Sequence, residues 1–144
     1  MIESLKEKIE KAIAFLMKNA TSARITVSPE EFEKTDAYEY LKMYILIRED
    51  TPADIVPLIA SHLPMLTYRK FKKRPMMQKW FETKLQKTVI CKVSAETLEK
   101  AKEYGEYFSL TEVHHQELGE LGLGFRVQKE YPKFFKFLPL YRAR

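Results

Sequence analysis

Apolar residues recur along the chain with two different periods, and these periods predict the order of its helices and strands. Residues 2–18 have the helical period, with lysines and glutamates on the opposite face. The apolar positions of this helix are Ile2, Leu5, Ile9, Ala12, Ile13 and Leu16. Residues 43–47 instead form an almost continuous apolar run, which is typical of a strand that is covered on both faces.

Residues 23–27 predict a short strand between these two elements. The segment SPEE at 28–31 is a capping box with proline at the first helical position, and it predicts a second helix or turn. No flexible linker separates these residues from the strand that follows. We therefore expect one domain, in which residues 1–40 are a helical extension and residues 41–144 form the compact unit.

A helical crossover is predicted after the first strand. Thr51 can cap a helix, Pro52 suits its first turn and Asp54 complements its dipole. The expected buried face consists of Ile55, Leu58, Ile59 and either Leu63 or Leu66. Proline removes a backbone donor, so we expect a kink or a break near Pro64. Pro75 then begins a short helix that carries Met76, Met77, Trp80 and Phe81.

Further strands alternate with shorter helices toward the C-terminus. The remaining strands are expected at residues 88–93, 107–113 and 121–127. Ser94 is placed to cap a helix that Gly105 ends, with Leu98 and Ala101 facing inward. A strand, a helical crossover and another strand make a unit of mixed or parallel sheet. The pattern therefore predicts an α/β fold with four strands.

Composition narrows the class of protein. A chain of 144 residues suits a single domain whose core needs no disulfides. No apolar run approaches the roughly 20 residues that span a bilayer, so we expect no association with membranes. The single cysteine, Cys91, lies in a strand pattern and has no partner for a disulfide within the chain. We expect it to be a buried core residue of a cytoplasmic protein.

The positive charge is concentrated in one short stretch. A net charge of +5 permits nucleic-acid binding without indicating it, so the distribution matters more. Six cations fall within about one helix length: Arg69, Lys70, Lys72, Lys73, Arg74 and Lys79. Arg69, Lys70, Lys72 and Lys73 could contact phosphates while nearby aromatic rings stack on bases. Alternatively, the aromatic rings form the inner face of two short helices and the cations are only solvated.

Several segments, taken in order, resemble the peptidyl-tRNA hydrolases of the archaeal and eukaryotic type. The matching segments are KMYILIRED, ASH, TYRKFKKRP, Trp80, LQKTVICKV, AKEYG, LGLGF and FKFLPLY. The resemblance covers residues 42–141, about two-thirds of the chain, and it lies in the order of the segments. It implies a small mixed four-stranded sheet with helices on both faces, preceded here by an extra N-terminal helix. It also implies tRNA as a partner and no cofactor.

The chain departs from that family where the family carries catalysis. The family has a glycine- and lysine-rich loop after its first strand, whereas TPADIVPLIAS contains neither residue. The family's aspartate at the end of the third strand falls on Val113 or on Tyr107, depending on the alignment. The shortened loop and the LPLYR ending are closer to an uncharacterised bacterial branch with the same fold. The resemblance leaves Arg48, Asp50, His62 and Thr111 as matching positions.

Two main interpretations follow from these residues, and a hydrolase for a different small substrate, using the shortened loops, is a third. In the first, the protein hydrolyses the ester of peptidyl-tRNA, with His62 as the base, Asp50 orienting it and His114 or His115 as second choice. Adjacent histidines on a strand point in opposite directions, so His114 and His115 do not predict a metal site. In the second interpretation, the protein has kept the fold without catalysis and binds RNA or a protein. A sheet edge could also pair two copies into a homodimer, although no pattern specifies one.

Overall fold

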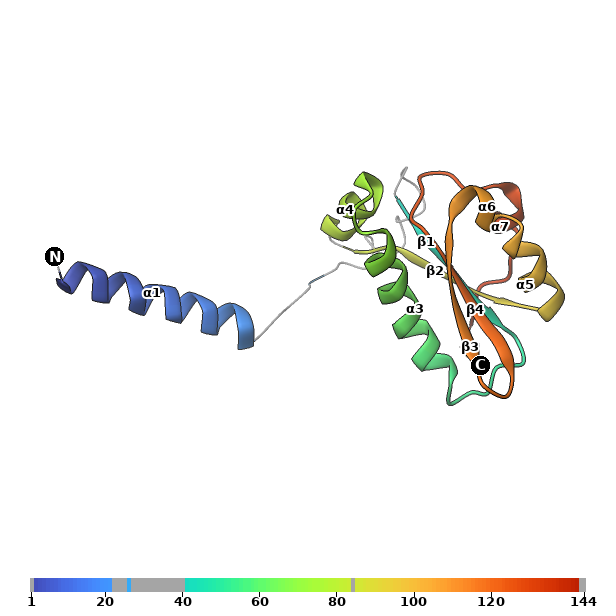
Figure 1. The fold of residues 1–144 in the computed structure, drawn as a ribbon, viewed down its shortest axis with the longest axis horizontal. Coiled ribbons are helices and arrows are strands. Elements are labelled where there is room, and N and C mark those ends of the chain that lie inside the picture. Colours follow the sequence, from blue (N-terminus) through green and yellow to red (C-terminus); the bar gives the residue numbers. More distant parts are fainter. Residues whose placement is uncertain (1, 22–25, 27–40, 84, 143–144) are drawn as a thin grey trace. The chain divides into compact units, whose positions relative to one another are not determined.

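The computed structural model describes residues 2–21, 26, 41–83 and 85–142 (Figure 1). The chain divides into two compact units, residues 1–33 and 34–144. In the first unit, helix α1 spans Ile2–Thr21, which confirms the expected N-terminal helix. The side chains of Leu5, Ile9 and Ile13 are exposed along it.

Several predictions for the N-terminal part fall on residues outside the described ranges. These are the strand at 23–27, of which only Thr26 is described, the helix or turn at 28–36, and the boundary at residue 40. Within the described ranges, none of the helices has the length and apolar character that crossing a membrane requires.

The second unit is built on a mixed four-stranded sheet, as predicted. Its strands are β1 (Met43–Arg48), β2 (Thr88–Val93), β3 (Leu110–His115) and β4 (Gly119–Phe125). The order across the sheet is β2-β1-β4-β3. Strand β1 pairs in parallel with β2, while β4 runs antiparallel to both β1 and β3. Strand β1 therefore lies inside the sheet and has hydrogen-bonded neighbours on both sides.

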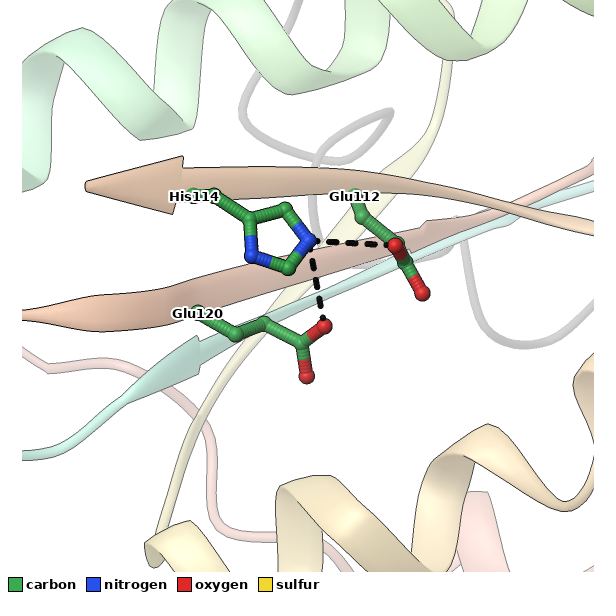
Figure 2. A group of neighbouring side chains, drawn as sticks. All are labelled: Glu112, His114 and Glu120. Carbon is green, nitrogen blue, oxygen red and sulfur yellow. Dashed lines mark hydrogen bonds and ion pairs between the residues drawn. The ribbon is translucent and has the colours of Figure 1, made fainter. Parts of the chain in front are cut away.

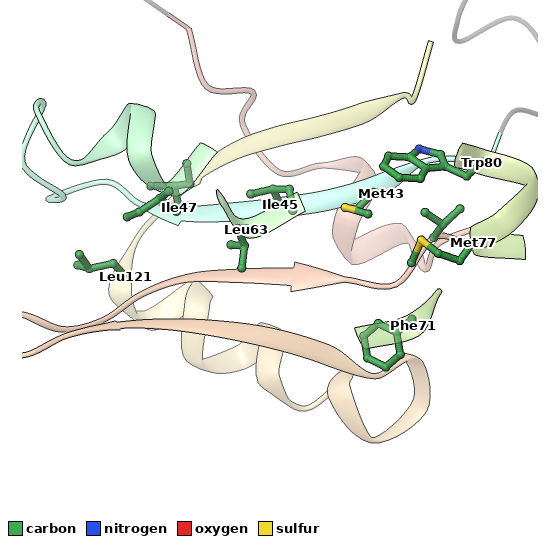
Figure 3. Packing of buried hydrophobic residues seen from close by; sticks show 10 residues of the cluster. Met43, Ile45, Ile47, Leu63, Phe71, Met77, Trp80 and Leu121 are labelled. Carbon is green, nitrogen blue, oxygen red and sulfur yellow. The ribbon is translucent and has the colours of Figure 1, made fainter. Parts of the chain in front are cut away.

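Helices cover both faces of the sheet, as expected from the resemblance (Figure 1). On one face lie α3 (Val56–Phe71) and α4 (Pro75–Glu82), whose buried side chains join Met43, Ile45 and Ile47 in one core cluster (Figure 3). On the other face, α5 (Ala95–Lys102) and α7 (Lys133–Lys136) join Tyr44 and Leu46 in a second cluster. Alternate residues of β1 thus supply both cores.

The crossover helix begins later than the sequence indicated. Thr51 is buried, and its hydroxyl has no hydrogen-bond partner in the part of the chain that the structure describes. A turn follows, in which the amides of Ile55 and Val56 donate to Pro52 O at 2.9 and 3.2 Å. Helix α3 starts at Val56, where Pro57 occupies the first turn. The predicted inward position of Leu58 is wrong, because its side chain is exposed.

Pro64 does not break α3, contrary to our expectation. A proline inside a helix costs about 3 kcal/mol because a backbone hydrogen bond is lost. Here Ile59 and Leu63 before it, and Thr67 and Phe71 after it, are all buried against the sheet. Burial of a whole stripe on either side of the proline offsets that cost and holds the two halves in one helix.

The boundaries near the third strand also differ from the prediction. Gly105 begins a short helix, α6 (Gly105–Phe108), instead of ending α5, so β3 starts at Leu110 and not at residue 107. Ser109, with φ 56°, turns the chain from α6 into the strand. The Ser94 cap is confirmed, since its Oγ accepts from Thr97 N at 3.1 Å.

Cys91 provides a test of the buried sheet. Burial raises the pKa of its thiol to about 11 from 9.0. Below pH 9 the thiol is protonated in both the folded and the unfolded chain, so its burial stabilises the fold fully. As the pH rises from 9 toward 11, the unfolded chain loses this proton first, and the free energy of unfolding falls. We expect iodoacetamide at pH 8 to alkylate the native protein far more slowly than the urea-unfolded chain. Equal rates would mean that Cys91 is accessible and that β2 is not packed as described.

Candidate functional site

A cleft of about 570 Å³ opens beside helices α3 and α4 and reaches the start of β2. Its wall includes Leu66 and Tyr68 from α3, Trp80 and Phe81 from α4, and Thr88 from β2. The volume lies within the range of about 300–1,000 Å³ that is usual for ligand pockets. The crossover and the short helix after it therefore enclose a site large enough for a ring system and its substituents.

Aromatic rings give this cleft a rigid apolar wall. The ring of Tyr68 stacks on Phe81, with centroids 4.5 Å apart and planes inclined by 20°. Trp80 is buried next to them, and its indole N–H donates to Lys87 O at 2.8 Å. Phe81, by contrast, is 52% exposed. The sequence left open whether these rings are core residues. Phe71 and Trp80 are buried, Tyr68 is half-buried and Phe81 is exposed, and the last three line the cleft.

The margin of the cleft is positively charged. Between Asp54 and Glu82 the sequence contains six cations and no acidic residue. The positive charge of this segment therefore exceeds the net charge of the whole chain, which is +5. None of these six cations forms an ion pair with a residue that the structure describes. The positive field at this end of the molecule is therefore not neutralised by the described neighbours.

The four cations predicted to contact RNA have different positions. Arg69 and Lys72 line the cleft, and Lys73 is exposed in the turn after α3. Lys70 points elsewhere: its Nζ donates to Leu110 O at 3.2 Å and lies 5.4 Å from the centre of the Phe71 ring. Of the four predicted cations, Arg69 and Lys72 thus line the cleft and Lys73 lies beside it.

His62 lies in the wall of the same cleft, one turn of α3 before Leu66. Its side chain is exposed. Among the described residues, no hydrogen bond or ion pair joins His62 to Asp50 or to His114. An imidazole at this place could contact a ligand, but none of the carboxylates that the structure describes is in position to orient it.

The ends of β1 and β3 do lie at the same edge of the sheet. Ile47 of β1 and Val113 of β3 are both paired with Gly122 of β4, so the three residues form one row. Asp50 follows β1 closely and His114 follows Val113 directly. The ends of β1 and β3 therefore lie next to each other as predicted, but the side chains of Asp50 and His114 do not contact each other there.

Asp50 is engaged in holding the sheet together. Its carboxylate pairs with Arg48 Nε, and Arg48 also donates to Glu120 O at 2.9 Å and to Leu118 O at 3.1 Å. Arg48 therefore ties the exit of β1 to the turn between β3 and β4. Because Asp50 is the ion-pair partner of this arginine, its position is explained without a catalytic role.

Thr111 is buried beneath α3. Its Oγ1 lies 2.5 Å from Thr67 Oγ1 and 3.3 Å from Gly124 O, and Thr67 Oγ1 donates to Leu63 O at 2.8 Å. These bonds satisfy two hydroxyls in the contact between helix and sheet. Thr111 therefore joins α3 to β3 and does not face the cleft.

His114 lies on the opposite face of the sheet, the one that α5 covers. Its Nε2 is 3.1 Å from Glu112 Oε2 and 3.5 Å from Glu120 Oε2 (Figure 2). Lys102 of α5 is 2.8 Å from the same oxygen of Glu120, and this contact raises the pKa of Lys102. The structure thus gathers Glu112, His114, Glu120 and Lys102 into a second polar group.

Sequence reasoning missed Glu120, Lys102 and the cleft itself. Glu120 lies on β4 and Lys102 on α5, so only the pairing of β3 with β4 and the packing of α5 bring them to His114. One signal for the cleft was present: the absence of acidic residues from residues 55–81 could have been read from the sequence.

The role assigned to Asp50 and Arg48 is testable by mutation. Arg48→Ala removes two hydrogen bonds to carbonyls and an ion pair, so we expect the free energy of unfolding to fall by about 1.5–3 kcal/mol. Asp50→Asn affects only the exposed end of the ion pair and should cost less than about 1 kcal/mol. Urea denaturation measures both, with Asp54→Asn in the next turn as the matched carboxylate control. A larger loss for Asp50→Asn than for Arg48→Ala would contradict this assignment.

No protein-family model matches this chain, and no curated protein matches it. The resemblance to peptidyl-tRNA hydrolases therefore stays a prediction from the sequence.

Proposed function

We propose that this protein binds the single-stranded end of an RNA, such as tRNA, in the cleft beside α3 and α4. The observation that supports this most is the combination of stacked, accessible aromatic rings with a cationic margin free of acidic residues. Proteins that bind single strands use these two elements together, rings for the bases and cations for the backbone.

Each part of the cleft has a counterpart in such a ligand. The face of Phe81, already supported by Tyr68, offers a surface on which an unpaired base can stack. Stacking of this kind contributes about 1–3 kcal/mol per base. Arg69 and Lys72, in the wall of the cleft, are placed for the phosphates on either side of that base, and Lys73 for the next one.

A binding function without catalysis agrees with the positions of the other candidates. Asp50 is paired with Arg48, and Thr111 is hydrogen-bonded under α3. His114 lies on the face that α5 covers, away from the cleft. Of the four catalytic candidates, only His62 lines the cleft. Hydrolysis needs a base that is oriented within reach of the attacking water, and His62 has no such partner among the described residues.

The charge at the margin can be tested by salt-dependent binding. We expect a fluorescently labelled single-stranded RNA and deacylated tRNA to bind, with affinity falling steeply as salt increases. The double variant Arg69→Ala/Lys72→Ala should bind more weakly and lower the slope of log K against log[salt] by about 1.4, since each lost phosphate contact on a single strand contributes about 0.7. Fluorescence anisotropy measures both quantities.

The matched control is Lys133→Ala/Lys136→Ala, which removes the same charge from α7 on the other face of the sheet. Its slope should remain close to that of the unaltered protein. Equal effects of the two double variants would mean that binding follows net charge alone, and this would contradict a role for the cleft. Phe81→Ala should weaken binding while leaving the salt slope unchanged, because a ring contacts no phosphate.

Hydrolysis of peptidyl-tRNA is the second candidate, and the place of His62 in the cleft wall is what favours it. An ester bound among Arg69 and the aromatic rings would lie near this imidazole. Incubation of peptidyl-tRNA with excess protein separates the two functions: we expect binding without release of the peptide. Release that disappears in His62→Ala would make the protein a hydrolase and would overturn the non-catalytic proposal.

A further inference from the structure

We propose that Glu112, His114 and Glu120 form a binding site for a divalent transition-metal ion, for which Zn²⁺ is the probe. One nitrogen and two carboxylate oxygens from these residues all lie within 4.8 Å of one another (Figure 2). The site is on the face of the sheet covered by α5, so it is separate from the cleft beside α3 and α4. This inference does not depend on the function proposed for that cleft.

The sheet itself positions the three side chains. Glu112 and His114 are two residues apart on β3 and therefore project from the same face. Glu120 is the residue of β4 that pairs with His114. An irregularity in the pairing between Val113 and His114 leaves Leu121 of β4 without a partner on β3, so that Glu120 comes to lie opposite His114. The ligands thus come from rigid elements and not from a loop.

The distances suit a small cation. His114 Nε2 is 3.1 Å from Glu112 Oε2 and 3.5 Å from Glu120 Oε2. In a tetrahedral site with ligands at about 2.1 Å, neighbouring ligand atoms are about 3.4 Å apart. An imidazole with two carboxylates is a donor set that Zn²⁺ accepts. The two carboxylate oxygens lie within 4.8 Å of each other, so rotation of the partly exposed Glu112 side chain would bring all three atoms to the spacing that an ion requires.

The burial of Glu120 is a second and independent indication of a ligand. Its side chain is only 8% exposed, and its Oε1 accepts no hydrogen bond from the described residues. A buried carboxylate oxygen without a partner is costly, and a bound cation would satisfy it. Lys102 meets Oε2, yet it also lies 3.4 Å from Glu99 Oε1 and can turn to that carboxylate when an ion binds.

The site is open to solvent on one side. The side chains of His114 and Glu112 are 57% and 40% exposed, so water can complete the coordination. His115 is excluded as a ligand through Nδ1, because that atom accepts from the amides of Glu117 and Leu118, both at 3.1 Å. Its bonds close the turn between β3 and β4.

Calorimetric titration of the full chain with ZnCl₂ tests the site. We expect one ion to bind per chain, and His114→Ala and Glu120→Gln each to weaken binding by more than the roughly 10-fold to 100-fold that loss of an outer-shell partner costs. His62→Ala and Glu117→Gln remove an exposed histidine and an exposed glutamate elsewhere, and should bind Zn²⁺ as the unaltered protein does. Zn²⁺ should also raise the melting temperature of the unaltered protein.

Two results would overturn the proposal. One is the absence of binding to the unaltered protein at a roughly 100-fold excess of Zn²⁺ over ~10 μM protein. This Zn²⁺ concentration is well above the dissociation constant of most protein zinc sites. The other is an equal loss of affinity in His62→Ala and His114→Ala, which would indicate non-specific binding to surface histidines. Should Glu120→Gln not fold, Glu112→Gln and His114→Ala, whose side chains are largely at the surface, keep the test decisive.

Discussion

The structure of the second unit depends on the burial of strand β1 on all sides. Its five residues from Met43 to Ile47 are inaccessible or nearly so, and they alternate between the two core clusters. Strand β2 pairs with it in parallel on one edge and β4 antiparallel on the other. Since parallel strands must be joined by a crossover, α3 and α4, which connect β1 to β2, have to cross a face of the sheet. The position of the cleft follows from this requirement.

The same requirement divides the polar chemistry between two faces. Helix α3 and its C-cap residue Lys72 place His62, Arg69 and Lys72 on one face, and the alternation of β3 directs Glu112 and His114 to the other. At the edge where β1 and β3 end, Arg48 and Asp50 form a clamp on the turn between β3 and β4. Polar residues that the chain brings to the same end of the sheet therefore lie on opposite faces of it.

Much of the fold could be predicted from the sequence because it rests on local patterns. The apolar run of β1, the TVICKV strand and the Ser94 cap each depend on a few neighbouring residues, and all three were found in place. The starts of α3 and β3 were predicted wrongly because tertiary packing decides them. Thr51 looked like a cap but is buried, and the stripe of buried residues around Pro64 keeps α3 continuous.

The candidate sites were harder to predict, because they combine residues that are distant in sequence. His114 was singled out, but its contact with Glu120 arises from the pairing of β3 with β4, and the contact of Glu120 with Lys102 arises from the docking of α5. Asp50 and Thr111 matched a family pattern, yet each has a structural partner: Arg48, two residues from Asp50, and Thr67, which only the packing of α3 on β3 brings to Thr111. Basic residues near aromatic ones were visible, whereas which ring faces the cleft depends on the packing of α4.

The most direct test of this account is to map, by NMR, where a short single-stranded RNA contacts the protein. Trp80 is the only tryptophan, so its indole N–H gives a single resonance at the wall of the cleft. We predict that RNA shifts this resonance together with the amides of Tyr68, Arg69 and Lys72, and leaves those of α5 and α7 unchanged. Shifts confined to α5 and α7, with the indole signal unmoved, would contradict the central claim.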